Sequence, residues 1–525
     1  MPDISQDSET SRQSNRGRGR GRERARRRGH RRGERKTVAM PAYITREIPY
    51  YEFLSEEGLV RLEDQADWLI QEVGLEFRDD PEALDIWRAA GADIRDTRVR
   101  LPRGMARKLC KTAPTKFTQH ARNPARSVEI GEESAVFAPV YGPPFVRDLE
   151  KGRRYGSIED FEKLVKLTYM LPALHHSGFV TCEPCDIPVN KRHFDMLYAH
   201  MRWSDKPSLG AITEKSRAED SVAMARILHG EAYMEDHCVI MGNVNTNSPL
   251  LVDRVVTEAI RTYSAANQGM IVAPFILGGA MGPVTTAASI AQAFAEAMMC
   301  CAFSQLVRPG SPFILGNFLS SMSLKSGAPT FGMPEPVASN YIIGQLARRL
   351  GVPLRCGGSL TSSKIADAQS AAESADSMHS TVMGGANFVL HAAGWLEGGL
   401  ATGFEKLLID ADRLGAYQKL LAGIALDDNG LGRNAYDDVE PAGHFLGSAH
   451  TMANYETAYY DAEMSNSDSF EQWQEDGSKD TERRAFERWN QMLNEYEAPP
   501  LDEAKDEELK AFIAQRKESM KDAWY

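Results

Sequence analysis

We predict an α/β fold of the TIM (β/α)8 barrel type from three observations on the sequence. Short apolar runs alternate with longer helical patterns from residue 135 to residue 400. About eight such units fall in roughly 250 residues, which is the number and size of this barrel. Several runs end in glycine or amide residues just before a helical pattern, as in residues 351–375. A doubly wound open sheet is the alternative, but no GxGxxG fingerprint opens the first unit.

The expected elements follow in order along this region. The strands lie near residues 136–140, 177–182, 208–213, 237–243, 270–276, 312–316, 353–357 and 386–391. The helices lie at residues 158–170, 192–202, 218–229, 251–266, 285–306, 336–350 and 365–383. Because a parallel barrel collects its active site at the carboxyl ends of its strands, functional residues are expected just after each apolar run.

Three further segments flank the barrel at residues 135–400. Residues 1–36 are rich in Arg and Gly with almost no apolar side chains, which predicts a disordered tail. In residues 37–134, apolar residues recur at helical spacing from Leu54 to Val73, so an N-terminal helical layer is expected. Residues 401–525 are helical in pattern and increasingly charged, and we expect their aromatic residues to pack on the barrel.

Charge is divided unevenly between the tail and the rest of the chain. The formal net charge is −12, but residues 1–36 hold thirteen Lys+Arg against five Asp+Glu. The remaining residues therefore carry −20, which disfavours nucleic acid as a partner of the folded part.

The seven cysteines are an odd number, and most lie in apolar runs. They are expected to be reduced thiols in a cytoplasmic protein. The longest uncharged stretch, residues 262–295, is broken by Pro and Gly, so we expect a core strand and helix rather than a membrane span. No secretory signal pattern follows the arginines.

The residues just past the predicted strands are mostly neutral or aromatic. They include Tyr141, Glu183, Cys185, Thr213, Asn243, Asn245, Asn247, Asn317, Ser359, Thr361, Ser363, His391 and Trp395. No P-loop, HExxH or close Ser-His-Asp set is present, so kinase, peptidase and hydrolase functions lack support. Cys182 and Cys185 form a single CxxC motif, which is a weak zinc signal; two buried or loop thiols are the alternative, and no metal ligand is assigned.

Three residues at or near these strand ends have ordinary structural alternatives. Lys364 and Asp367 are three residues apart and could pair as neighbours on one helix face, or they could orient the site. His391 ends the last apolar run and is either a core histidine or a functional one.

Three motifs resemble the trimethylamine methyltransferase (MttB) superfamily. They are residues 326–335 (SGAPTFGMPE), 364–369 (KIADAQ) and 391–399 (HAAGWLEGG), and the likeness extends over nearly the whole chain. The resemblance implies a TIM-barrel methyltransferase that passes a methyl group from a methylated amine to the cobalt(I) of a separate corrinoid protein. A corrinoid carried by that partner is then the cofactor, and none is permanently bound.

The absence of pyrrolysine sets the expected substrate. Founding members of the superfamily carry pyrrolysine in the active site, whereas this sequence has only the twenty standard residues. When a quaternary ammonium gives up a methyl group, the leaving group is a neutral tertiary amine, which needs no proton. Neutral trimethylamine, in contrast, must first be activated. Quaternary amines such as glycine betaine, proline betaine or carnitine are therefore the expected substrates.

Seven residues are the candidate substrate-binding set, assigned from position and residue type near the family motifs. We expect Tyr141, Phe331 and Trp395 to form an aromatic cage, in which each cation–π contact contributes about 0.5 to 2 kcal/mol. His391, Asn243 or Lys364 would hold a substrate carboxylate, and Glu335 would face the cation. No residue is assigned a catalytic role.

Three other functions remain as alternatives. They are a trimethylamine-specific corrinoid methyltransferase, a zinc-dependent methyltransferase acting on a thiol, and an RNA-associated protein that uses its Arg-rich tail. We also expect a homo-oligomer.

Overall fold

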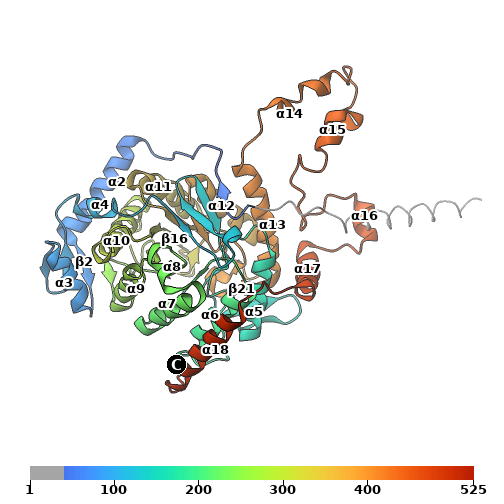
Figure 1. Cartoon of the computed structure of the whole chain (residues 1–525). Coiled ribbons are helices and arrows are strands. Elements are labelled where there is room, and N and C mark those ends of the chain that lie inside the picture. Colours follow the sequence, from blue (N-terminus) through green and yellow to red (C-terminus); the bar gives the residue numbers. More distant parts are fainter. Residues whose placement is uncertain (1–40, 525) are drawn as a thin grey trace, which may run out of the picture. The chain divides into compact units, whose positions relative to one another are not determined.

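A ten-stranded sheet lies at the centre of the protein in the computed structural model, which describes residues 41–524 (Figure 1). The strand order is β10-β11-β13-β15-β18-β19-β7-β6-β5, and β1 pairs with β7. Pairing is parallel from β10 to β7 and antiparallel at β7, β6 and β5. The parallel strands are β7 (Ser134–Phe137), β10 (Ser208–Leu209), β11 (Ile240–Val244), β13 (Gly269–Val272), β15 (Phe313–Gly316), β18 (Leu354–Gly357) and β19 (Phe388–Leu390). The predicted α/β class is confirmed, with seven of the eight expected strands close to their expected places.

The eighth expected strand, residues 177–182, is not a regular strand, yet its backbone bonds to both ends of the parallel run. On one side, the His175 N–H donates to Phe137 O (3.0 Å) and the Gly142 N–H donates to Val180 O (2.7 Å). On the other side, the Ser177 N–H donates to Pro207 O and the Leu209 N–H donates to Gly178 O, both at 2.9 Å. This segment therefore lies between β7 and β10.

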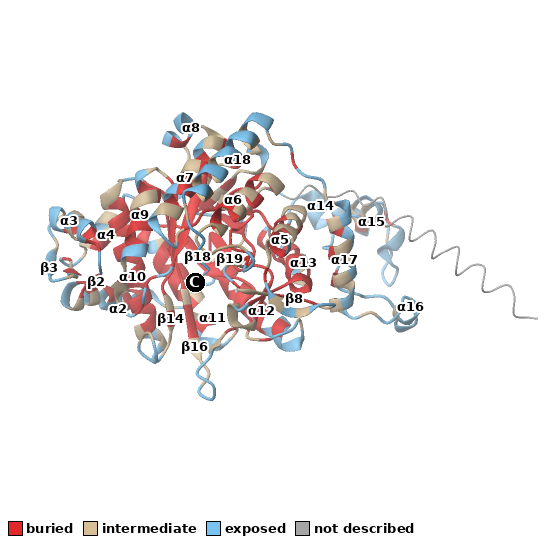
Figure 2. Cartoon of the chain, turned by 90° about the horizontal axis from the view of Figure 1, so that it is seen from below, coloured by how far each residue is buried: buried red, intermediate tan, exposed pale blue. Residues whose placement is uncertain are grey.

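Helices pack along the outer face of the parallel strands. They are α5 (Ile158–Met170), α6 (Arg192–Trp203), α7 (Lys215–His229), α8 (Glu231–Asp236), α9 (Arg254–Ala265), α10 (Thr286–Val307), α11 (Pro334–Leu350), α12 (Ala368–Gly384) and α13 (Phe404–Leu421). All seven expected helices are present. Residues of β11, β13, β15 and β18 are buried throughout, as expected for parallel strands covered on both faces (Figure 2).

Helix α10 is the core of this layer. Within residues 41–524 it is the one helix long and apolar enough to cross a membrane, and 89% of its apolar window is buried inside the fold. Its residues from Ser289 to Gln305 are buried without a break. Such burial on every side is typical of a central helix in a large α/β protein, and it agrees with the expectation of a core strand and helix here.

The N-terminal segment is mixed rather than purely helical. It holds the helices α2 (Glu56–Trp68), α3 (Pro81–Ala89) and α4 (Met105–Cys110), with η1 (Leu69–Val73) and η2 (Pro124–Arg126). It also holds the strands β1 (Ile44–Thr45), β2 (Leu75–Phe77), β3 (Asp93–Arg95), β4 (Arg98–Arg100), β5 (Lys116–Gln119) and β6 (Val128–Gly131). These strands are too short to show a period of two clearly, so the helical spacing of α2 dominated the sequence pattern. The tail predicted at residues 1–36 lies outside the described residues.

Two small sheets lie beyond the carboxyl ends of the parallel strands. One contains β14 (Phe275–Leu277), β16 (Phe318–Met322) and β17 (Pro329–Thr330). The other contains β8 (Phe145–Asp148), β9 (Gly152–Tyr155), β20 (Trp395–Leu396) and β21 (Ala401–Gly403), with η3 at Glu397–Gly399. Both sheets carry residues of the candidate site.

The C-terminal segment is helical, as predicted. After α13 it contains α14 (Asp428–Leu431), η4 (Arg433–Tyr436), η5 (Phe445–Gly447), α15 (Ala449–Asn454), α16 (Phe470–Glu475), α17 (Thr481–Glu495) and α18 (Glu503–Glu518).

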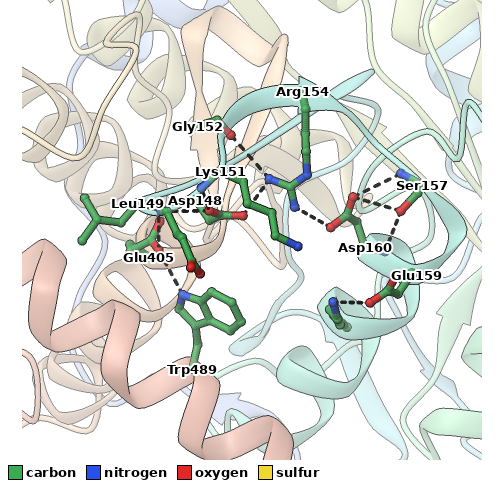
Figure 3. A network of polar contacts seen from close by, with 12 residues as sticks. Asp148, Leu149, Lys151, Gly152, Arg154, Ser157, Glu159, Asp160, Glu405 and Trp489 are labelled. Atoms are coloured by element: carbon green, nitrogen blue, oxygen red, sulfur yellow. Dashed lines mark hydrogen bonds and ion pairs between the residues drawn. The ribbon is translucent and has the colours of Figure 1, made fainter.

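Polar contacts and aromatic packing join the later helices to the body (Figure 3). The Glu405 carboxylate accepts from Trp489 Nε1 (3.0 Å) and from the Leu149 N–H (3.1 Å). Trp489 also packs on Phe404, with ring centroids 5.1 Å apart. Packing of this aromatic residue on the body is therefore confirmed. Nearby, Arg154 bridges Asp148 and Asp160, both at 2.6 Å, and fixes the β8–β9 hairpin to the start of α5.

The contact between α11 and α12 gives a test of the packing. A Cβ atom added to Gly344 would overlap the backbone carbonyl oxygen of Gly384, which has no freedom to move aside. We expect Gly344→Ala to lower the free energy of unfolding by about 1 to 3 kcal/mol through overpacking, measured by urea denaturation. Gly447→Ala is the matched control, because nothing lies within 4 Å of its added Cβ. Equal stability of the two variants would contradict this view of the interface.

Candidate functional site

An aromatic cluster lies at the carboxyl end of the parallel strands. Phe331 and Trp395 are buried, with ring centroids 5.6 Å apart and planes at 81°. Phe318, the first residue of β16, lies 6.4 Å from Phe331 and 5.9 Å from Trp395. Val140 and Leu360 complete this cluster. Several aromatic faces in one buried place can attract an organic cation by cation–π contact.

His391 extends the cluster and is held in an uncommon backbone conformation. Its ring lies 4.4 Å from Trp395 and 5.5 Å from Phe318. Its φ of 59° is in the left-handed region, which costs a non-glycine residue about 1 to 3 kcal/mol unless the surroundings enforce it. The enforcing contacts are backbone ones: the His391 N–H donates to Pro139 O, and its Nδ1 accepts from the Tyr141 N–H at 3.2 Å.

Arg355 is a buried cation beside the same rings. It is the second residue of β18, is 1% exposed, and lies with its guanidinium carbon 5.0 Å from the Phe318 ring centroid. Its one side-chain hydrogen bond within residues 41–524 is from Nη1 to Asn317 O (3.2 Å), while Nε is buried without a partner. Within residues 41–524 no carboxylate pairs with it. Burial lowers the pKa of Arg355 to about 10, so the group remains charged at neutral pH.

The positive charge of Arg355 and burial both act on His391. Burial is the larger cause, and together they lower the pKa of His391 well below its usual value of 6.5. The imidazole is therefore neutral at physiological pH. A neutral histidine cannot serve as a proton donor of the imidazolium kind, so the site holds one fixed positive charge, on Arg355.

Amide oxygens without partners lie on the neighbouring strands. Asn243 in β11 is 7% exposed, and Asn317, which follows β15, is 2% exposed. The Oδ1 atom of each is buried with no hydrogen-bond partner in the described part of the chain. Since buried polar groups are nearly always paired, these oxygens are further places where a bound molecule could be recognised.

Two hydrogen-bond networks position the cluster. Trp395 Nε1 donates to Thr361 O (3.1 Å), and Thr361 Oγ1 donates to Glu373 in α12 (2.7 Å). On the other side the Gly394 N–H donates to Asp410 in α13 (2.9 Å), and Asp410 forms a buried ion pair with Lys406. The indole is therefore fixed from both helices that flank its loop.

The glycines after β18 allow the neighbouring strand ends to meet. A Cβ atom added to Gly358 would lie 2.6 Å from the Cα of Ala392. Only glycine permits this approach, which brings the Thr361 loop beside His391 and Trp395.

Most of the seven predicted binding residues lie near this cluster. Phe331, Trp395 and His391 are in contact, Tyr141 is joined to His391 through its backbone, and Asn243 is buried in β11.

The remaining two predicted binding residues are exposed. Lys364 lies in the loop before α12 and donates to Ser362 O (2.8 Å), and Glu335 is in the first turn of α11. Lys364 does not pair with Asp367, because Asp367 caps α12 by accepting from the Ser370 N–H. The helix therefore begins at Ala368 rather than at residue 365, which puts Lys364 outside it.

Sequence reasoning missed Arg355 and Phe318. A charged residue in the middle of the apolar run Val352–Gly358 was the available signal for Arg355. Phe318 directly follows Asn317, which was singled out, and that position was the available signal for it.

The CxxC motif does not form a group of metal ligands with its neighbours. Cys182 is buried and Cys185 is exposed. His175 and His176 are occupied by hydrogen bonds to Gln418 and Gln119. Across residues 41–524, no three His, Cys, Asp or Glu side chains are grouped so that they could hold a metal ion.

Comparison with known proteins agrees with the resemblance in the motifs. The family model described as "Trimethylamine methyltransferase (MTTB)" matches residues 17–521. A glycine betaine methyltransferase of Desulfitobacterium hafniense (strain Y51) is 35% identical over 470 residues, which cover 89% of this chain and 98% of the relative. A proline betaine:corrinoid methyltransferase of Eubacterium limosum is 25% identical, covering 81% and 89% of the two chains. Trimethylamine methyltransferase MttB of D. hafniense (strain DSM 10664 / DCB-2) is 24% identical, covering 86% and 90%.

These matches define the class of protein as a methyltransferase. Because the family model spans most of its length, the chain belongs to the trimethylamine methyltransferase (MTTB) family.

The buried histidines predict acid sensitivity. Burial lowers the pKa to about 3 in His175 and about 4 in His200, and well below 6.5 in His176 and His391. Below pH 6.5 the unfolded chain binds protons at these sites and the folded chain does not, so stability falls as pH falls, by about 1.4 kcal/mol per pH unit for each group. Urea denaturation from pH 7.5 to pH 5 measures this slope.

A single variant makes this prediction specific. Asn tolerates the left-handed conformation, so His391→Asn should reduce the slope by one proton. A flat stability profile down to pH 5 would contradict the neutral, buried state of these four side chains.

Proposed function

We propose that this protein transfers a methyl group from a quaternary amine of the betaine type to the cobalt(I) of a partner corrinoid protein. The observation that carries the proposal is the buried Arg355 beside the Phe318, Phe331 and Trp395 rings. A betaine carries a permanent cation and a carboxylate. The rings suit the cation, and the unpaired guanidinium suits the carboxylate.

The charge of Arg355 also distinguishes betaines from simple cations. A buried cation without a counter-ion repels a second positive charge, and a low local dielectric strengthens that repulsion. A trimethylammonium ion brings no carboxylate to offset it. A zwitterion does, and bidentate Arg–carboxylate pairing adds directional hydrogen bonds. This favours a betaine over trimethylamine as substrate.

The protein's contribution to the reaction is positioning. Loss of one methyl group from a quaternary nitrogen leaves a neutral tertiary amine, so no side chain has to supply a proton. The neutral state of His391 fits this requirement. The corrinoid of the partner supplies the cobalt nucleophile. The rings and Arg355 would hold the substrate so that one methyl group faces it, and such orientation can contribute several kcal/mol.

We further propose that the central sheet closes as a (β/α)8 barrel. Residues 175–180 would take the place of the second strand, between β7 and β10. The backbone hydrogen bonds from this segment to both neighbours support closure. Active sites of such barrels lie at the carboxyl ends of the strands, where Asn317, His391 and Tyr141 are found.

Removal of the guanidinium should separate betaine activity from folding. We expect Arg355→Met to lower kcat/KM for glycine betaine by about 30-fold or more, because loss of one member of a buried charge pair costs 2 to 5 kcal/mol. Methyl-cobalt formation on a corrinoid partner, followed by absorbance with a panel of amines, measures this. Arg88→Met is the matched control, because the Arg88 side chain on α3 is exposed. Turnover of trimethylamine but not of betaines by the unaltered protein would overturn the substrate assignment.

Truncation of the rings tests the cation site. We expect Trp395→Ala and Phe331→Ala each to weaken glycine betaine binding by about 2- to 30-fold, as for the loss of one cation–π contact. Isothermal titration calorimetry, with circular dichroism to confirm folding, provides the measurement. Phe470→Ala is the control, because that ring is 65% exposed. Unchanged affinity in both site variants would remove the aromatic cage from the proposal.

A further inference from the structure

A protruding segment of the C-terminal region has both of its ends on α13. This segment, residues 424–459, is called the arm here, and it is the orange part that carries α14 and α15 in Figure 1. It begins after Leu421, the last residue of α13. The arm ends where the chain comes back to α13, at Asp412. Asp412 Oδ1 accepts from the Tyr460 hydroxyl (3.0 Å) and from the Glu463 N–H (2.9 Å). Between these ends α15 packs against η4 and η5 of the same arm.

The arm exposes an unusual amount of apolar surface. Of the 25 large apolar side chains that are exposed in residues 41–524, nine lie in these 36 residues. They are Ile424, Leu426, Leu431, Tyr436, Phe445, Leu446, Met452, Tyr455 and Tyr459. Figure 2 shows α14 and α15 largely in the pale blue of exposed residues. Clustered rather than scattered apolar exposure marks a surface that another molecule covers.

The arm is also acidic, which restricts what can cover it. It contains six Asp and Glu residues against one Arg, a net charge of −5. Two arms would repel each other if they met directly. The covering surface should therefore combine apolar side chains with positive charge.

The same chain carries such a surface around α2. A hollow of about 600 Å³ is lined by Glu63, Gly104, Arg107, Lys108, Lys111, Arg349 and Leu350. Lys108 and Lys111 have no ion pair within residues 41–524, whereas Arg349 is paired with Glu56 and Glu63 of α2. Tyr51, Phe53 and Val60, on or just before this helix, are 52%, 46% and 40% exposed. We call these three residues and the lining of the hollow the α2 face.

We propose that the arm of one copy docks on the α2 face of a second copy of this chain. Arg107 and Arg349 on the α2 face are already paired with acidic residues of α2, so the positive charge offered to the acidic arm comes from Lys108 and Lys111. Both surfaces also expose apolar side chains. Arm and face on different copies would generate a symmetric oligomer or a closed ring. This inference is independent of the substrate proposed above.

The corrinoid partner is less suited to the arm because of where the arm begins. The Leu421 carbonyl accepts from the Glu47 N–H, two residues after β1, and β1 pairs with the start of β7 at Ser134. The arm therefore leaves the body near the amino end of the parallel strands. The aromatic cluster and Arg355 lie towards the carboxyl end, where a methyl acceptor must arrive.

The mass of the full-length protein in solution tests the proposal. Size-exclusion chromatography with light scattering should give a multiple of 58.2 kDa for the unaltered chain. The triple variant Tyr436→Ser, Leu446→Ser and Tyr455→Ser should give 58.2 kDa, because these side chains are 70%, 76% and 74% exposed and their loss leaves the fold intact. Leu324→Ser, at a 93% exposed position outside the arm, should keep the full mass.

A charge exchange identifies the docking surface. Lys108→Glu with Lys111→Glu should dissociate the assembly, and so should Asp437→Lys with Asp438→Lys. Mixing these two variants should restore assembly, because at the substituted positions both arm–face pairs between the two variants are opposite in charge, whereas within either variant alone the arm and the face have the same sign there. The proposal would be overturned if the unaltered protein had a solution mass of 58.2 kDa, or if the arm variants kept the mass of the assembly. Arm variants that keep their mass but no longer methylate the corrinoid protein would assign the arm to that partner instead.

Discussion

The unpaired charge of Arg355 is the constraint around which the site is organised. A guanidinium at 1% exposure loses most of its hydration, and the carbonyl of Asn317 and the face of Phe318 restore only part of that stabilisation. The lost hydration energy of this guanidinium is least compensated when no anionic group lies beside it, and a bound carboxylate would compensate it. Burial is the main cause of the lowered pKa of His391, and the charge of Arg355 lowers it further, so both effects keep this imidazole neutral.

The geometry of the rings depends on two helices that flank the aromatic cluster. Glu373 of α12 holds Thr361, whose carbonyl receives the Trp395 indole, and Asp410 of α13 holds Gly394. Burial lowers the pKa of Lys406 and raises that of Asp410, yet each offsets the other's desolvation as an ion pair. A buried ion pair is weak evidence for stability. It does hold the Asp410 carboxylate in place for the Gly394 N–H, since either group alone would be a buried, uncompensated charge.

Sequence reasoning reached much of this arrangement because the signals were local and repeated. Apolar runs and helical spacing located seven strands and all seven helices, and α5 matches its expected bounds of 158–170. Strand ends then pointed to Tyr141, His391 and Trp395. Lys364 and Arg355 show the limit of this reasoning. Lys364 is exposed because Asp367 caps α12 after it, and Arg355 is buried because of the side of β18 from which its side chain extends. The spacing of residues in the sequence predicts neither feature.

Helix α13 connects parts of the molecule that are far apart in sequence. Asp410 on it holds the loop of Trp395, Glu405 binds Trp489, and Asp412 anchors the returning end of the arm. Asp410 and Asp412 are two residues apart on one rigid rod. A displacement of the arm where Asp412 holds it would therefore act on the same helix that holds the Trp395 loop through Asp410, so α13 links the periphery of the fold to the aromatic cluster.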